Sequence, residues 1–183
     1  TSRRITFLFG FVMFLMLTIP DRAVSAEGAV NKPPMLHAQQ WYWALDPSPE
    51  TLEPQKNLEA VKNLSFTTID EKALANLEYL LPGKRGYIWI RGEFPSLEVF
   101  SPKPLGLFLG RVTMTDQTWV NGIFVGSTGR NPPNYFSYWN TSREYAIPPE
   151  AIELHKPITV TMRIWVDGEG SLASRPFIGF RED

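Results

Sequence analysis

Short apolar runs separated by turn residues dominate the second half of the chain and predict β-strands. Strand patterns cover residues 40–45, 87–94, 105–109, 111–120, 123–125, 144–147, 158–166 and 177–180. The pair Asn121-Gly122 lies between two of these runs and predicts a tight hairpin, because both central residues of such a turn need positive φ. Short strands at this spacing, with little helix, are typical of a β-sandwich or barrel.

The segment before these strands has a mixed pattern. Pro47, Pro49 and Pro54 predict a loop over residues 46–55. Residues 64–69 partly alternate between apolar and polar, as a half-buried strand does. Asp70 can cap the N-terminus of a short helix over residues 71–81, whose apolar residues share one face. We therefore expect an all-β fold with one short helix before the core strands.

The first 26 residues have the layout of a secretory signal peptide. Two arginines, Arg3 and Arg4, precede an apolar run over residues 5–19, and small residues lead up to Ala26. An uncleaved membrane anchor is the alternative, although the run is shorter than the ~20 apolar residues that cross a bilayer. In both cases we expect residues 27–183 to form a single exported domain, periplasmic or extracellular and free or membrane-tethered.

The composition narrows the chemistry. The formal net charge of −1 gives no electrostatic basis for binding nucleic acid. The absence of cysteine excludes disulfides, cysteine metal sites and a thiol nucleophile. Neither of the two histidines, His37 and His155, has a second histidine at metal-ligand spacing, and no Gly-x-Ser-x-Gly motif is present. We expect no metal, no cofactor and no catalytic residues, so the domain itself is not expected to be an enzyme.

Three stretches together resemble a known family. They are Gly86-Tyr87-Ile88-Trp89-Ile90-Arg91, the stretch from Leu107 to Gly129, and Arg143-Glu144-Tyr145-Ala146-Ile147-Pro148. In this order they resemble the galactose-binding-like jelly roll, the sugar-binding domain of glycoside hydrolase family 2 enzymes and sialate O-acetylesterases. The same fold occurs in extracytoplasmic sensor domains of bacterial membrane signalling proteins. The family often has a Gly-x-Asn turn where this chain has Leu154-His155-Lys156-Pro157, and residues 27–85 match little.

The resemblance implies a binding domain rather than a catalyst, since the related enzymes hold their catalytic groups in another domain. The first hypothesis is a carbohydrate-binding sensor domain of a larger membrane signalling protein, and the alternative is an accessory sugar-binding domain of a secreted glycoside hydrolase or esterase. A module that binds only other proteins is a third. The last predicted strand ends at Phe180, close to the end at Asp183, so we expect a longer parent chain. The expected partners are a small carbohydrate-like ligand or a neighbouring domain of that chain, with the membrane reached only through an anchor or following transmembrane segments.

The loop between residues 130 and 143 is the first candidate site. It offers aromatic rings for stacking on a sugar, amides for hydrogen bonds to hydroxyls, and one cation. The candidate residues there are Asn134, Tyr138, Trp139, Asn140 and Arg143. The alternative is that the aromatic residues cover the end of the sandwich core.

Four further residues are secondary candidates. Arg91 and Arg163 lie mid-strand, where side chains alternate, so each shares a face with a tryptophan two residues away. Each arginine either stacks on that tryptophan on a partly exposed face or binds a ligand carboxylate. The Asn121 side chain can also face a ligand. Asp167 belongs to an Asp-Gly-Glu sequence that fits a turn better than a catalytic carboxylate pair.

Overall fold

Two antiparallel β-sheets and four short helical segments make up the computed structural model, which describes residues 35–46, 54–99 and 103–181. The helical segments are α1 (Pro54–Val61) and the 3₁₀ helices η2 (Glu71–Leu80), η3 (Pro82–Lys84) and η4 (Pro149–Ala151). The strands are β1 (Leu36–His37), β2 (Gln40–Leu45), β3 (Thr67–Ile69), β4 (Arg85–Phe94), β5 (Leu105–Arg111), β6 (Thr115–Val120), β7 (Ile123–Thr128), β8 (Ser142–Ile147), β9 (Ile158–Asp167) and β10 (Phe177–Phe180).

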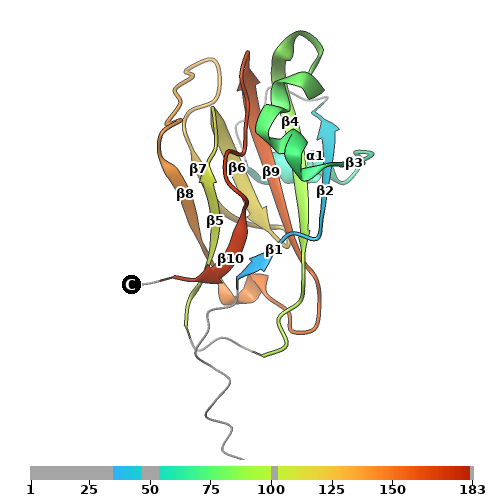
Figure 1. Cartoon of the computed structure of the whole chain (residues 1–183), viewed down its shortest axis with the longest axis vertical. Coiled ribbons are helices and arrows are strands. Elements are labelled where there is room, and N and C mark those ends of the chain that lie inside the picture. The colour runs from blue at the N-terminus through green and yellow to red at the C-terminus, as the bar shows by residue number, and fades with distance from the viewer. Residues whose placement is uncertain (1–34, 47–53, 100–102, 182–183) are drawn as a thin grey trace, which may run out of the picture. The chain divides into compact units, whose positions relative to one another are not determined.

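One sheet has four strands in the order β1-β10-β5-β8, and the other has six in the order β3-β2-β4-β9-β6-β7. Most of the strands run along the long axis of the view in Figure 1. The ten-residue strands β4 and β9 pair along their whole length, from Arg85 opposite Asp167 to Phe94 opposite Ile158. The all-β sandwich expected from the sequence is confirmed.

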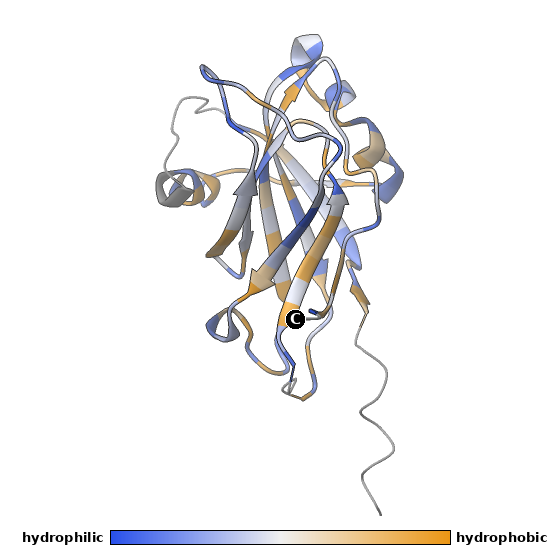
Figure 2. Ribbon diagram, turned by 90° about the vertical axis from the view of Figure 1, so that its left-hand side faces the viewer, coloured by the Kyte–Doolittle hydropathy of each residue, from blue (hydrophilic) through white to orange (hydrophobic). Residues whose placement is uncertain are grey.

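The main core lies between the two sheets. Side chains at alternate positions of the strands point into it, as is usual where two sheets pack face to face. The six-stranded sheet supplies Ile88, Ile90 and Ile164, and the four-stranded sheet supplies Leu107 and Leu109, all of them fully buried. Figure 2 shows hydrophobic and hydrophilic segments following one another along the strands.

A second apolar cluster lies on the opposite, outer face of the six-stranded sheet. Trp89 of β4 and Trp119 of β6 are completely buried there, with ring centroids 5.5 Å apart. Residues from α1 and the segment after it, including Val61 and Phe66, pack onto the two indoles. This face of the sheet is therefore covered, not open to solvent.

The predicted loop over residues 46–55 was wrong at its end, because α1 begins at Pro54. Proline is tolerated in the first turn of a helix, where its missing N–H has no intrahelical partner. The predicted strand over residues 64–69 is confined to Thr67–Ile69, and the one over 111–120 begins at Thr115, directly after Met114 with φ +81°.

The predicted helix after Asp70 exists, but its geometry differs. The Asp70 side chain accepts a hydrogen bond from the backbone N–H of Lys72 at 2.8 Å, as expected of an N-cap. The segment is a 3₁₀ helix with a break at Asn76, and Leu74 and Leu77 are buried. Among the described residues, no helix is long and apolar enough to span a membrane.

Two turns at one end of the six-stranded sheet contain residues with positive φ angles. Asn121 (φ +45°) and Gly122 (φ +82°) form the predicted hairpin turn between β6 and β7. His155 has φ +60° in the turn before β9, so a histidine takes there the conformation that glycine adopts most easily. Its exposed ring lies 3.1 Å from Glu98 Oε2.

Candidate functional site

The loop that joins β7 to β8, residues 129–141, presents four aromatic side chains to solvent. Trp139 is 62% exposed and Tyr138 is 49% exposed, and Tyr135 and Phe136 are also more than a third exposed. The rings of Phe136 and Tyr138 contact each other edge to face, with centroids 4.9 Å apart. These aromatic residues therefore do not serve as a cover for the core, which was the alternative left open by the sequence.

Backbone hydrogen bonds fix the first half of this loop. Arg130 and Phe136 each donate an N–H to the other's carbonyl oxygen, at 2.8 and 2.9 Å. The Thr115 hydroxyl donates to the side-chain oxygen of Asn131, and the Ser137 hydroxyl donates to the Met114 carbonyl at 3.1 Å. The loop is thereby attached to the start of β6.

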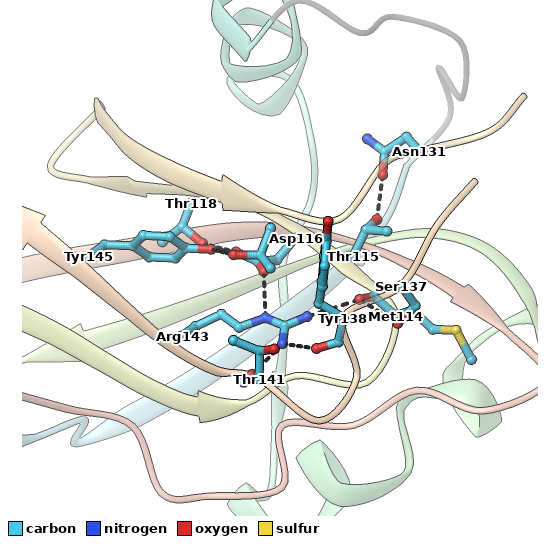
Figure 3. A network of polar contacts seen from close by, with 11 residues as sticks. Met114, Thr115, Asp116, Thr118, Asn131, Ser137, Tyr138, Thr141, Arg143 and Tyr145 are labelled. Carbon is cyan, nitrogen blue, oxygen red and sulfur yellow. Dashed lines mark hydrogen bonds and ion pairs between the residues drawn. The ribbon is translucent and has the colours of Figure 1, made fainter. Parts of the chain in front are cut away.

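The second half of the loop rests on the guanidinium of Arg143, a residue that is only 1% exposed. Its Nη1 donates to the carbonyl oxygens of Tyr138 and Thr141, and its Nη2 donates to that of Met114 at 3.1 Å. Figure 3 shows this guanidinium surrounded by the three carbonyl groups. Hydrogen bonds to a charged donor contribute roughly 1.5–3 kcal/mol each, so this side chain determines the path of the loop.

A buried carboxylate compensates the charge of Arg143. Asp116, 2% exposed, accepts a hydrogen bond from Arg143 Nε at 3.3 Å and others from Thr118 Oγ1 and Tyr145 Oη at 2.9 and 2.8 Å. Burial raises the pKa of Asp116 above its usual value, and these hydrogen bonds and the cation oppose that rise. The pKa of Tyr145 is also raised, by burial and by the neighbouring carboxylate.

The ring of Tyr145 reaches this network only because β7 has a glycine beside it. A Cβ atom added at Gly126 would lie 2.3 Å from Tyr145 Cδ1. The Tyr145 hydroxyl also lies 2.7 Å from Thr128 Oγ1. Side chains of β6 and β8 are thus joined into one buried polar network beneath the loop (Figure 3), and the half-buried Thr128 of β7 extends it.

A pocket of about 270 Å³ opens between the tip of this loop and strands β6 and β7. Its polar lining residues include Arg130 and two loop asparagines, Asn131 and Asn134. The full lining is Asp116, Gln117, Ser127, Gly129, Arg130, Asn131, Pro133 and Asn134. Among the described residues, no group of three metal-ligating side chains gathers in one place.

Four of the five first-choice candidate residues are exposed on the loop. Asn134, Tyr138, Trp139 and Asn140 are all exposed. Arg143 lies beneath them, and its donors are occupied by backbone carbonyls and Asp116, so we assign it a positioning role in place of the predicted ligand contact.

The two mid-strand arginines contact residues outside this loop. Arg163 is buried, donates to Asp46 Oδ2 at 2.5 Å, and has its guanidinium carbon 3.7 Å from the ring centroid of Tyr87. Arg91 lies 3.8 Å from the ring centroid of Phe66. The expected stacking of each arginine on its neighbouring tryptophan was wrong, because the covering segment and the adjacent strand supply closer rings.

The remaining two secondary candidates have structural contacts. Asn121 donates its side-chain amide to the Ala151 carbonyl at 2.8 Å and accepts from the Thr159 N–H at 2.7 Å. Asp167 lies 3.4 Å from Arg85 Nε, at a turn in which Gly168 has φ +78°. The turn interpretation of this Asp-Gly-Glu sequence fits the structure.

Sequence reasoning missed Asp116 as the partner of Arg143, and Arg130 and Ser127 as pocket residues. The sequence did contain a signal for the pairing of Asp116 with Arg143. Arg143, Tyr145 and Ile147 alternate along one strand and so share the core face, where a buried cation needs a carboxylate. Asp116 is the second residue of a fully buried strand, which is itself an unusual place for an acid.

Comparisons with solved structures identify the fold. The chain is similar to a β-glucuronidase of Ruminococcus gnavus (13% identity, TM-score 0.58, covering 83% of this chain and 30% of that one). It is also similar to a rhamnosidase of a Novosphingobium species (13% identity, TM-score 0.52, 82% and 15%) and to a β-glucuronidase of Faecalibacterium prausnitzii (15% identity, TM-score 0.50, 73% and 21%).

The likeness confirms the galactose-binding-like β-sandwich fold expected from the sequence. The chain spans less than a third of the length of each of these structures. No protein-family model matches it, and no curated protein matches it significantly.

Proposed function

We propose that this domain binds a small carbohydrate on the 129–141 loop and has no catalytic activity of its own. The observation behind the proposal is that Trp139 and Tyr138 are exposed on a loop whose path is fixed from below by Arg143. Sugars bind proteins by placing an apolar C–H face on an aromatic ring while fixed polar groups receive the hydroxyls. Exposed loops on a rigid sandwich are the usual place for such residues.

The fold neighbours support the same proposal. They are glycoside hydrolases, and this chain matches only a fraction of each, as an accessory domain would. We therefore consider two settings for the domain: the sensor part of an exported membrane signalling protein, and a domain beside the catalytic domain of a secreted glycosidase or esterase. The segment of the parent gene after Asp183 distinguishes them, since it encodes transmembrane helices in the first case and a catalytic domain in the second.

Binding is tested by titrating the protein with glucose, galactose, mannose and rhamnose while recording amide and indole NMR shifts. We expect at least one sugar to shift the Trp139 indole signal, and Trp139→Ala to remove the binding. Tyr79→Ala is the matched control, because Tyr79 is 70% exposed and lies on η2, outside the loop. Binding that survives Trp139→Ala and is lost in Tyr79→Ala would contradict the proposed site.

The absence of catalysis is tested with chromogenic glycosides and acetyl esters. We expect no turnover above that of buffer. Turnover that disappears in Asp167→Asn or Glu169→Gln would show that the carboxylates of the Asp-Gly-Glu turn act in catalysis.

A further inference from the structure

We propose that the pocket at the tip of the 129–141 loop selects a sugar that bears a carboxylate, and that Arg130 binds this carboxylate. The inference rests on the proposed function, since it specifies the class of sugar that the loop takes; Tyr138 and Trp139 themselves are not part of the pocket lining. Besides Asp116 and Gln117 of β6, the polar residues of the pocket lining are Ser127, Arg130, Asn131 and Asn134. None of them belongs to the buried network that holds the loop together except Asn131, which accepts from Thr115.

The position of Arg130 is fixed while its guanidinium stays accessible. Its backbone N–H and carbonyl oxygen are both bonded to Phe136, and its guanidinium carbon lies 5.5 Å from the centroid of the Phe136 ring. The residue is exposed, and no ion pair holds it within the described part of the chain. Its planar donors can therefore meet a ligand carboxylate in the two-bond geometry that arginine favours.

The one carboxylate in the pocket lining, that of Asp116, does not repel an anionic ligand. Asp116 already accepts hydrogen bonds from Arg143, Thr118 and Tyr145, so its charge is compensated from inside the sandwich. Arg130 is then the uncompensated charge of the lining.

The charge and the size of the pocket limit the ligand. A phosphate carries a charge of about −1.5 to −2 near neutral pH, whereas the lining holds a single accessible cation, which matches one carboxylate. Pockets for drug-sized ligands measure roughly 300–1,000 Å³, so the 270 Å³ found here suits a single sugar ring. The side-chain amides of Asn131 and Asn134 and the Ser127 hydroxyl are suited to the ring hydroxyls.

The test compares D-glucuronate with D-glucose, which differ only at C6, and uses D-glucose 6-phosphate and acetate as further probes. Dissociation constants are measured by NMR titration of the chain and of its variants Arg130→Gln, Trp139→Ala and Arg111→Gln. Arg111 is the control, because it is an exposed arginine at the end of β5, away from the pocket lining. The amide signals of Ser127, Gly129 and Arg130 report on the pocket itself.

We expect glucuronate to bind about tenfold more tightly than glucose or acetate, as a charge-assisted bidentate contact allows. Arg130→Gln should abolish that difference, whereas Arg111→Gln should preserve it. Equal binding of the two sugars, tighter binding of the phosphate or of acetate, or an unaltered preference in Arg130→Gln overturns this inference while the proposed function stands. Binding of neither sugar overturns both.

Discussion

Two regions of this domain combine aromatic residues with arginines, but the aromatic side chains are buried in one region and exposed in the other. On the outer face of the six-stranded sheet, Trp89 and Trp119 are fully buried beneath α1 and the segment that follows it. On the 129–141 loop, Tyr138 and Trp139 remain exposed, and the arginine lies underneath. The same residue types therefore form a core in one place and a candidate binding surface in the other.

The difference between the two regions lies in what covers them. The sheet face is covered by a helix that the sequence pattern did not predict, and its tryptophan nitrogens have no hydrogen-bond partner among the described residues. A buried unsatisfied donor costs about 1–3 kcal/mol, which the packing of the indoles must outweigh. In the loop, the Tyr138 and Thr141 carbonyl groups are hydrogen-bonded from below by Arg143, and the aromatic rings remain exposed.

Trp119→Ala should give the largest effect that separates the two regions. Removing this fully buried ring leaves a cavity beside Trp89, and we expect a loss of about 3–5 kcal/mol of unfolding free energy. Urea denaturation followed by circular dichroism measures it. A loss below about 1 kcal/mol would mean that the outer face is not a packed core.

Arg143→Met should be almost as damaging, although it lies beneath the exposed region. It leaves the buried Asp116 carboxylate without its cation and removes one donor from each of three carbonyl groups, and breaking a buried pair costs about 3–5 kcal/mol. Arg111→Met is the control, since exposed substitutions change stability by less than about 0.5 kcal/mol. Equal denaturation midpoints for the two variants would contradict the positioning role of Arg143.

Gly122→Val tests the hairpin that leads into the loop. A β-branched residue at φ +82° is strained by about 1–3 kcal/mol, and no neighbouring atom lies close enough to add a clash. The melting temperature should fall accordingly. Gly168→Val, at φ +78° in another open turn, is the comparison and should show a loss of the same size.

Trp139→Ala should have the smallest effect on stability. Its side chain is 62% exposed, so we expect a change within about 0.5 kcal/mol, against the large loss for Trp119→Ala. Thermal melting of both variants under the same conditions compares the two losses of stability. A loss of several kcal/mol in Trp139→Ala would place this ring in the core and remove the basis of the proposed binding site.

Much of the sandwich could be predicted because strand alternation and turn chemistry are local. The pattern predicted β2 and β10 with their observed ends, and it placed Trp89 and Arg91 on one face of their strand. It could not show that this face is covered, because the cover comes from a helix that begins at a proline and packs across strands distant in sequence.

The candidate site was predictable in part for the same reason. Polar and aromatic residues of one loop, such as Asn134 and Trp139, lie close together in the sequence. They could therefore be grouped into one candidate site from the sequence alone. The contacts of Arg143 depend on which strands of the two sheets face each other, and Asp116 lies 27 residues away. Only the fold shows that this arginine supports the loop from inside the sandwich.

The support of the loop by a strand residue has a consequence for how the domain can change over generations. The backbone path depends on Arg143 and Asp116, whereas a ligand would meet Asn134, Tyr138, Trp139 and Asn140. Replacing the second set would alter what the proposed site binds without altering how the loop is held. If the loop binds a sugar as proposed, its specificity is open to diversification, by natural drift or in a designed library of loop variants, at little risk to folding.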